Sequence, residues 1–251
     1  MNVPALIALG GNTGDVRATF EAALRGLHDR RGVTVTAASR AYRTPAVGAN
    51  AGGEFLNAAA TLETTLSPHE LLAALQDLET AAGRERTVHW GPRSIDLDLI
   101  LFGEESLDDE RLTVPHPGLW WRRFVLDPAC EVAGDWKASR VPLQRLREPL
   151  LDRPLRVGMR TDDVASLNRL ASALEPDFPL SIEPWEPGTR DLRSPPALWI
   201  KREDAAEGRL DPNTILVPRD PDAAVAVLRD VLSAALPDPE PQPVGEPLWP
   251  C

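Results

Sequence analysis

The sequence predicts an α+β protein in two compact parts, and three observations support this. Short apolar runs alternate with helical spacings along residues 1–150, a turn-rich boundary falls near 152–155, and a second alternation of strand and helix patterns follows it. The 251 residues suffice for one large or two modest domains, each with its own core. We expect a first domain at 1–153, a second at 154–236 and a proline-rich tail at 237–251.

The first domain is expected to begin with a buried strand at 3–9 that runs into the turn Gly10-Gly11-Asn12. A helix from about 15 to 29 follows, with Phe20, Leu24 and Leu27 on one side. Residues 33–42 alternate as one strand, and residues 55–62 form another after a glycine-rich loop.

The second helix of this domain has a clear beginning and end in the sequence. Ser67 suits the N-cap and Pro68 the first helical position, and Gly83 closes the helix. Leucines at 71, 72, 75 and 78 repeat at helical spacing between them. An apolar strand at 95–101 follows.

The order strand–helix–strand–strand–helix–strand predicts a ferredoxin-like sandwich, with an antiparallel sheet and both helices on one face. Its other face would then be left to loops and ligand. A short helix is expected at 120–126, after the turn Val114-Pro-His-Pro117.

The second part predicts a small α/β unit. A strand at 156–159 precedes a helix at 162–175 with Val164, Leu167, Leu170 and Leu174 inward. Further strands are expected near 180–183, 197–202 and 214–218, and Asp220-Pro221 caps a last helix that ends at Leu236. Six prolines in residues 237–250 predict an extended, mobile tail.

Charge and composition exclude several classes of function. The net charge of −11 argues against general binding to nucleic acid or anionic membrane. Only two lysines occur, Lys137 and Lys201, and neither follows a glycine-rich loop, so a P-loop nucleotide site is excluded. Cys130 and Cys251 form no metal-ligand spacing. Neither a signal peptide nor a long apolar span is evident, so we expect a cytoplasmic protein with no membrane partner.

The strand at 95–101 carries the most informative chemistry. Alternation puts Asp96 and Asp98 on one face, while Ile95, Leu97, Leu99 and Leu101 point into the core. Leu99 is therefore not expected to contact a bound cofactor. Carboxylates two residues apart can converge on one cation or a close pair of cations, and hard oxygen ligands suit Mg²⁺ bound to phosphates. The guanidinium group of Arg93 could bind those phosphates in a bidentate manner. The alternative is an ordinary strand with a solvated polar face.

Six blocks together resemble the 6-hydroxymethyl-7,8-dihydropterin pyrophosphokinase family over residues 3 to about 150. They are Ala8-Leu-Gly-Gly-Asn-Thr-Gly-Asp15, Tyr42-Arg-Thr-Pro45, Phe55-Leu-Asn-Ala58, Gly83-Arg-Glu-Arg86, Trp90 to Gly103, and Leu112 to Gly118 through Arg122 to Leu126. The resemblance implies transfer of a diphosphate from ATP to the hydroxymethyl group of 6-hydroxymethyl-7,8-dihydropterin, with release of AMP, in folate biosynthesis. ATP would be a co-substrate.

The resemblance also assigns the residues that would hold metal and nucleotide. Asp96 and Asp98 match carboxylates that hold two Mg²⁺ ions, and Arg84 and Arg93 match catalytic, phosphate-contacting arginines. The remaining nucleotide contacts implied are Glu79, Trp90, Arg111, Thr113, His116 and Arg122. Each has an ordinary alternative: a surface arginine, a helix-surface acid, or a turn histidine between two prolines.

The resemblance implies that the pterin lies between two aromatic rings, an arrangement that suits its apolar faces and polar edge. Phe55 and Phe124 match the stacking pair, and Asn57 offers donors and acceptors to the ring edge, as does the backbone around Thr44, Pro45 and Val47. For either phenylalanine the alternative is a position in the core.

Two other functions stay open from the sequence. One is a catalytically silent module that binds pterin or nucleotide and regulates a partner; the other is a metal-dependent phosphohydrolase that uses the aspartate pair on water. For the C-terminal unit, we prefer a structural or oligomerising role to a second activity. A homodimer is compatible with the sequence.

Overall fold

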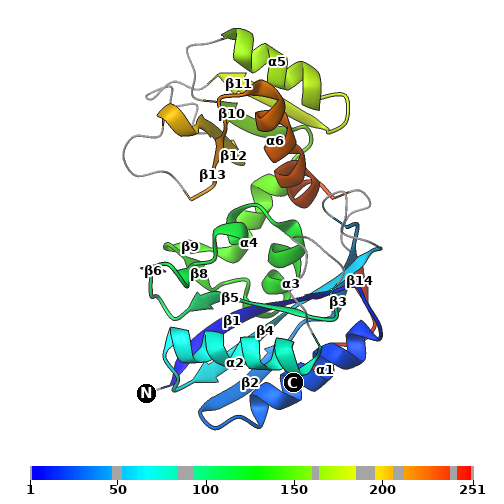
Figure 1. The fold of residues 1–251 in the computed structure, drawn as a ribbon, viewed down its shortest axis with the longest axis vertical. Coiled ribbons are helices and arrows are strands. Elements are labelled where there is room, and N and C mark those ends of the chain that lie inside the picture. Colours follow the sequence, from blue (N-terminus) through cyan, green and yellow to red (C-terminus); the bar gives the residue numbers. More distant parts are fainter. Residues whose placement is uncertain are drawn as a thin grey trace. The chain divides into compact units, whose positions relative to one another are not determined.

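The computed structural model (Figure 1) describes seven stretches of the chain, namely residues 2–46, 53–83, 93–159, 164–184, 196–205, 212–237 and 242–249. Within these stretches, no helix combines the length and the apolar character needed to cross a bilayer.

The chain divides into two compact units, and one interrupts the other in sequence. The first unit comprises Met1–Leu119, Phe124–Gln144 and Asp238–Cys251, and the second comprises Trp120–Arg123 and Arg145–Pro237. The expected order of domain, domain and separate tail is therefore corrected. The tail belongs to the first unit because it pairs with that unit's sheet, as described below.

The first unit follows the expected alternation of strands and helices. Its main elements are β1 (Val3–Gly11), α1 (Val16–His28), β2 (Val33–Ala38), β3 (Ala41–Thr44), β4 (Phe55–Thr64), α2 (Pro68–Ala81) and β5 (Asp96–Phe102). Asp15 caps α1 by accepting a hydrogen bond from the Ala18 amide, and Ser67 and Glu70 form a reciprocal capping box on α2. The expected helix boundaries are confirmed to within a few residues.

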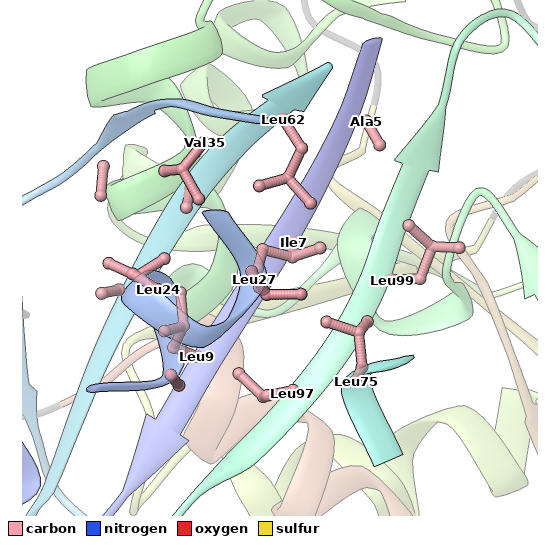
Figure 2. Close-up of a cluster of buried hydrophobic side chains, with 14 of the residues drawn as sticks. Ala5, Ile7, Leu9, Leu24, Leu27, Val35, Leu62, Leu75, Leu97 and Leu99 are labelled. Atoms are coloured by element: carbon pink, nitrogen blue, oxygen red, sulfur yellow. The ribbon is translucent and has the colours of Figure 1, made fainter. Parts of the chain in front are cut away.

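The sheet of the first unit is antiparallel throughout. Its order is β14-β3-β4-β1-β5, and β2 pairs with a different part of β4. The core lies on the face covered by α1 and α2, where Leu24, Leu27 and Leu75 of the helices meet strand side chains that include Ile7 and Leu99 (Figure 2). These side chains are at most 2% exposed, so the helices seal this face of the sheet.

Two strand expectations are wrong in detail. The expected strand at 33–42 is two strands, because Ser39 interrupts the pairing: its hydroxyl accepts from the Ala59 amide, and its own amide donates to the Ala59 carbonyl. On β5, Leu101 does not continue the row of Leu97 and Leu99. Ile7 opposes Leu99 but Leu6 opposes Leu101, so the register shifts at this point, and Phe102 enters the helix-side core instead.

The other face of the sheet is not left to loops alone. The expected helix at 120–126 is replaced by a 3₁₀ turn, η1 (Pro117–Trp120), and a longer helix, α3 (Arg123–Ala133). Apolar side chains continue past 126, with Ala129 and Ala133 buried, which explains the greater length. The Tyr42 hydroxyl donates to the Glu131 carboxylate at 2.6 Å and thereby ties β3 to α3.

Several short elements were not predicted from the sequence patterns. They are β6 (Leu107–Asp108), β7 (Thr113–Val114), β8 (Lys137–Ala138), β9 (Val141–Pro142), α4 (Leu143–Arg147) and η2 (Glu148–Leu151). Elements of two to five residues contain too few positions for a period to be recognised.

The expected mobile tail is also corrected. Its strand β14 (Gln242–Val244) pairs antiparallel with β3, and Leu248 is 5% exposed within the core that α1 and β2 share. The Leu248 amide donates to the Ser39 carbonyl, and the Trp249 and His28 ring centroids are 5.1 Å apart. Proline is tolerated here because β14 lies at the edge of the sheet.

The second unit contains a four-stranded parallel sheet in the order β11-β10-β12-β13. Its elements are β10 (Leu155–Met159), α5 (Val164–Leu174), β11 (Leu180–Pro184), β12 (Leu198–Arg202), η3 (Glu203–Ala205), β13 (Thr214–Val217) and α6 (Pro221–Ala235). The expected strands and helices occur at these positions. Val164 is the exception: it is 61% exposed, at the first residue of α5, whereas Leu167, Leu170 and Leu174 are buried.

Candidate active site

Three neighbouring strands align a row of residues across the sheet, on the face opposite α1 and α2. Gly10 of β1 is directly opposite Asn57 of β4 and Asp96 of β5. A Cβ atom at Gly10 would lie 3.3 Å from the Asn57 amide oxygen and 3.8 Å from the Asp96 Cβ. The bare backbone of Gly10 therefore leaves a gap between an amide and a carboxylate.

Asp98 lies one step further along the same face, opposite Ala8 of β1. Asp96 and Asp98 are partly exposed, whereas Leu97 and Leu99 between and beyond them are buried in the core. The alternation on β5 is thus the one that the sequence predicts for this segment, and both carboxylates share a face with Gly10.

Arg93 is fixed just before β5 by the turn that ends β1. Its amide donates to the Asn12 side-chain oxygen at 2.9 Å, and the Asn12 amide donates to the Arg93 carbonyl at 3.0 Å. The Arg93 guanidinium forms an ion pair with the Asp96 carboxylate, and its carbon lies 5.9 Å from the centre of the Phe55 ring. A cation assigned to phosphate, a carboxylate assigned to metal and an aromatic ring therefore meet at one point.

The residues expected at the pterin edge are also together. The Asn57 amide donates to the Thr44 hydroxyl at 2.8 Å, and both side chains are buried. Thr44 pairs with Phe55 across β3 and β4, and Pro45 follows directly. This bond fixes the orientation of the Asn57 amide, whose oxygen faces Gly10.

Glu79 lies on α2, on the helix side of the sheet, and is 3% exposed. Its carboxylate accepts a hydrogen bond of 2.8 Å from the Leu97 amide, between Asp96 and Asp98 in sequence. β5 is the edge strand of this sheet in the described part of the chain, and on its side away from β1 Glu79 supplies the acceptor that a further strand would otherwise provide. Glu79 therefore holds the strand that carries both aspartates.

His116 is attached to β5 through its backbone. Its amide donates to the Ile100 carbonyl at 3.0 Å, where the β1–β5 register shifts. The ring Nδ1 accepts from the Gly118 amide at 3.0 Å, so the neutral imidazole carries its proton on Nε2.

The remaining expected residues are less closely linked to this site. The Arg111 amide donates to Asp109, and the Thr113 hydroxyl donates to Asp108. Phe124 is the second residue of α3 and is half-buried. Arg122 belongs to the segment that groups with the second unit, and its guanidinium carbon lies 4.8 Å from the Trp121 ring centre. Val47, Arg84 and Trp90 lie outside the described residues.

Sequence reasoning missed the positions that hold this site together. Gly10 lies near the end of β1 and Asn12 directly follows that strand, where a Gly-Gly-Asn sequence signals close backbone approach. At Gly11 a Cβ would lie only 2.6 Å from the Ser94 carbonyl oxygen. Tyr42 and Glu131 gave no signal, because residues 89 apart in sequence meet only in the fold.

Charge around Tyr42 is set by its contact with Glu131. Burial, and then the hydrogen bond to Glu131, raise the pKa of the Tyr42 phenol well above its ordinary value. Burial alone would raise the pKa of the Glu131 carboxyl, but hydrogen bonds from Tyr42 and Arg40 outweigh it and hold that pKa below the ordinary value. The phenol therefore stays protonated and the carboxylate stays charged near neutral pH.

The donor set suits a cation that brings other ligands with it. Among the described residues, no group of three or more histidine, cysteine or acidic side chains gathers as a metal site. Two carboxylates on one strand face are too few for a structural zinc site. They match the coordination preference of Mg²⁺, which binds one or two carboxylates and completes its shell with water and phosphate oxygens.

Comparison with known proteins places the first unit in a known group. A family model described as 7,8-dihydro-6-hydroxymethylpterin-pyrophosphokinase matches residues 6–134. A Bacillus subtilis protein named 2-amino-4-hydroxy-6-hydroxymethyldihydropteridine pyrophosphokinase is 46% identical over 132 residues, which cover 53% of this chain and 79% of that protein. A Synechocystis protein of the same name is 42% identical over 54% of this chain and 69% of its own length.

Two further similarities involve longer proteins. The mitochondrial folate synthesis bifunctional protein of Arabidopsis thaliana is 41% identical over 129 residues, which are 51% of this chain and 23% of that protein. A Plasmodium falciparum HPPK-DHPS crystal structure with pteroate is 11% identical, with a TM-score of 0.49 over 73% of this chain and 57% of that one. This chain thus spans little more than half of that solved chain.

Proposed function

Because this chain belongs to the 7,8-dihydro-6-hydroxymethylpterin-pyrophosphokinase family, we propose that it transfers a diphosphate from ATP to the hydroxymethyl group of 6-hydroxymethyl-7,8-dihydropterin. AMP is the second product, and the reaction belongs to folate biosynthesis. The observation that carries the proposal is the row of Asn57, Gly10 and Asp96, with Arg93 on Asp96. The strand order β5-β1-β4-β3 supports a ferredoxin-like description of this unit.

Asp96 and Asp98 would hold two Mg²⁺ ions on the phosphates of ATP. When bound, the ions would neutralise charge on the phosphate oxygens during an in-line displacement. The shared face of the two carboxylates and the oxygen-only donor set support this assignment. Glu79 positions them from the other side of the sheet through the Leu97 amide, rather than by touching the nucleotide.

Arg93 would bind the phosphates after leaving Asp96. In the structure its charge is neutralised by a carboxylate that needs a cation. A nucleotide that arrives with metal would supply both replacements, a cation for Asp96 and an anion for Arg93. We assign Arg84, Arg111, Thr113, His116, Arg122 and Trp90 to the nucleotide on the family resemblance alone.

The pterin would bind against Phe55 with its polar edge toward Asn57. The Thr44 hydroxyl holds the Asn57 amide in one orientation, so its donor and acceptor are presented in a fixed order. Phe124 would supply the second stacked ring, and the backbone of Thr44, Pro45 and Val47 would complete the edge contacts.

The chain's own residues then act by positioning and by electrostatics. The hydroxymethyl oxygen of the pterin forms a bond to the β-phosphorus of ATP and releases its proton to solvent, while the bond from that phosphorus to the α–β bridging oxygen breaks and AMP leaves with that oxygen. Gly10 keeps the space between the pterin side and the phosphate side of the row open. Little covalent chemistry is asked of the protein, because alignment and charge neutralisation supply most of the acceleration.

One assay separates this function from its two rivals. Purified full-length protein is mixed with ATP and Mg²⁺, with and without the hydroxymethyl pterin, and AMP is measured. We expect AMP only when the pterin is present. Nucleotide consumption without pterin would indicate a phosphohydrolase, and tight pterin binding without AMP would indicate a silent module. A cytoplasmic location and a homodimer stay predictions.

A further inference from the structure

The second unit has a cavity of about 140 Å³ at one edge of its parallel sheet. Three of its lining residues are the last residues of three strands: Met159 of β10, Arg202 of β12 and Val217 of β13. Because the strands are parallel, their carboxyl ends meet at this edge. Side chains along α5, from Ser166 to Ala173, and from the first turns of α6 complete the lining.

The order of the strands favours ligand binding at this edge. The chain runs from β10 outward to β11, and the next strand, β12, pairs on the opposite side of β10. The direction of the connections therefore reverses between β10 and β12. In open parallel sheets, ligands bind outside the carboxyl ends of the strands at such a reversal.

The cavity is locally positive in an acidic protein. Among the described residues, Arg169, Arg202 and Arg219 line it, against one acid, Asp222. Arg202 is held by Asp204, with Nε 3.0 Å from Oδ1, and Asp204 also interacts with Arg219. Within the described part of the chain, the three arginines exceed the two acids even with Asp204 counted, although residues 145–237 as a whole carry 13 basic and 16 acidic groups.

Hydrogen bonds fix the side chains of two of the three arginines. The Arg202 side chain is 30% exposed and has a two-pronged contact with Asp204, and Arg169 donates to the Ser166 hydroxyl at 3.0 Å. The N-terminus of α6 is not the source of the positive charge, because the Asp220 carboxylate already accepts a hydrogen bond from the Ala223 amide there. The guanidinium groups are thus the elements that would recognise a ligand.

We propose that this cavity binds the phosphate group of a small phosphorylated molecule, as a second ligand site distinct from the active site. Pockets that enclose a whole drug-sized ligand are about 300–1,000 Å³, so 140 Å³ suits one phosphate group, with the rest of any larger ligand outside. Arginine forks match phosphate oxygens in geometry and charge.

The test is an NMR titration of the ¹⁵N-labelled full chain with inorganic phosphate and, separately, with AMP. We expect saturable shifts of the Met159, Val217 and Ala224 amides, which report on the cavity and not on the active site. Arg219→Gln should weaken this binding about tenfold or more, since it removes a charged hydrogen-bond donor. Arg219→Lys should weaken it less, because the charge is kept and only the fork is lost.

Arg156→Gln is the matched control. Arg156 lies in the same sheet and pairs with Glu183 at 2.9 Å, but it does not line the cavity. This variant should bind phosphate as the wild type does. All variants should keep full diphosphate transfer, and amide spectra with the dispersion of the wild type should show that their second unit, where the substitutions lie, is folded.

Shifts confined to the first unit, or equal affinity in wild type and Arg219→Gln, would overturn the proposal. If AMP binds the cavity more tightly than inorganic phosphate, the natural ligand is a phosphate monoester; if only inorganic phosphate binds, it is the free ion. Because the readout is binding in the second unit, failure here leaves the diphosphokinase assignment untouched.

Discussion

Arg93 and Asp96 form an ion pair three residues apart, at the point where the β1 turn delivers Arg93 to the start of β5. The two groups to which we assign opposite roles, phosphate binding and metal binding, therefore neutralise each other in the structure. Their side chains are 18% and 25% exposed, so solvent only partly screens the pair. Under the proposed function, binding of ATP with magnesium would replace this ion pair by a contact of Asp96 with the metal and a contact of Arg93 with phosphate.

Asp96→Asn and Asp98→Asn should each reduce diphosphate transfer by about 10²–10³-fold or more, since each removes a charge that several kcal/mol of transition-state stabilisation depends on. Neither side chain lies in the core, so both variants should stay folded, with a larger loss of thermal stability in Asp96→Asn because it removes the partner of Arg93. AMP formation and a melting curve check both points. Near-normal turnover in either variant would overturn the metal assignment.

Gly10→Ala should raise the KM for the pterin more than the KM for ATP, because the new methyl group would press on the Asn57 amide at 3.3 Å. Gly53→Ala is the matched control: a Cβ at Gly53 meets nothing within 4 Å, and its φ is not positive. Steady-state kinetics of both variants give the comparison. Equal effects on the two substrates would argue against the role of the row.

Glu79→Ala should destabilise the protein by about 2–3 kcal/mol, because the Leu97 amide loses its acceptor in a buried place. Glu79→Gln keeps an acceptor oxygen and should recover most of that stability. Urea denaturation measures both, and activity should follow stability if Glu79 acts through β5. An inactive but fully stable Glu79→Gln would instead indicate direct contact with substrate.

Tyr42→Phe should cost about 1.5–3 kcal/mol at neutral pH, because it removes the hydrogen bond to a charged, half-buried carboxylate. The folded-state pKa of Glu131 is lowered, so its contribution is present above the unfolded pKa and is lost as the pH falls through the folded one. The stability difference between wild type and variant should therefore narrow from about pH 7 to about pH 3. Urea denaturation at both pH values checks this, and a constant difference would contradict it.

Leu248→Ala should cost about 2–5 kcal/mol, since this leucine is buried in the first unit's core although it stands near the C-terminus. Leu216→Ala is a control of the same chemistry at an exposed position in β13, where little loss is expected. Thermal melting of both variants is the measurement.

It follows that a chain ended near residue 150 would lose β14 and Leu248 along with the second unit. Aggregation of that truncated protein would not identify a role for the second unit.

Much of the fold follows from local patterns that the sequence states directly. Ser67, Pro68 and Glu70 begin α2 by capping chemistry, and Asp96 and Asp98 alternate with buried leucines. Such features depend on neighbours within a few residues, so a single sequence is enough to find them. The motif order also sufficed to identify the family that the comparisons confirm.

The tertiary structure alone decided which distant segments meet. Ser39 splits one expected strand into two by bonding to Ala59, and the register shift between β1 and β5 moves Leu101 off its expected face. Tyr42 forms a hydrogen bond with Glu131, and strand β14 of the proline-rich tail pairs with β3 at the edge of the sheet. These outcomes depend on hydrogen bonds and packing between residues far apart in the chain, which leave no period or motif in the sequence itself.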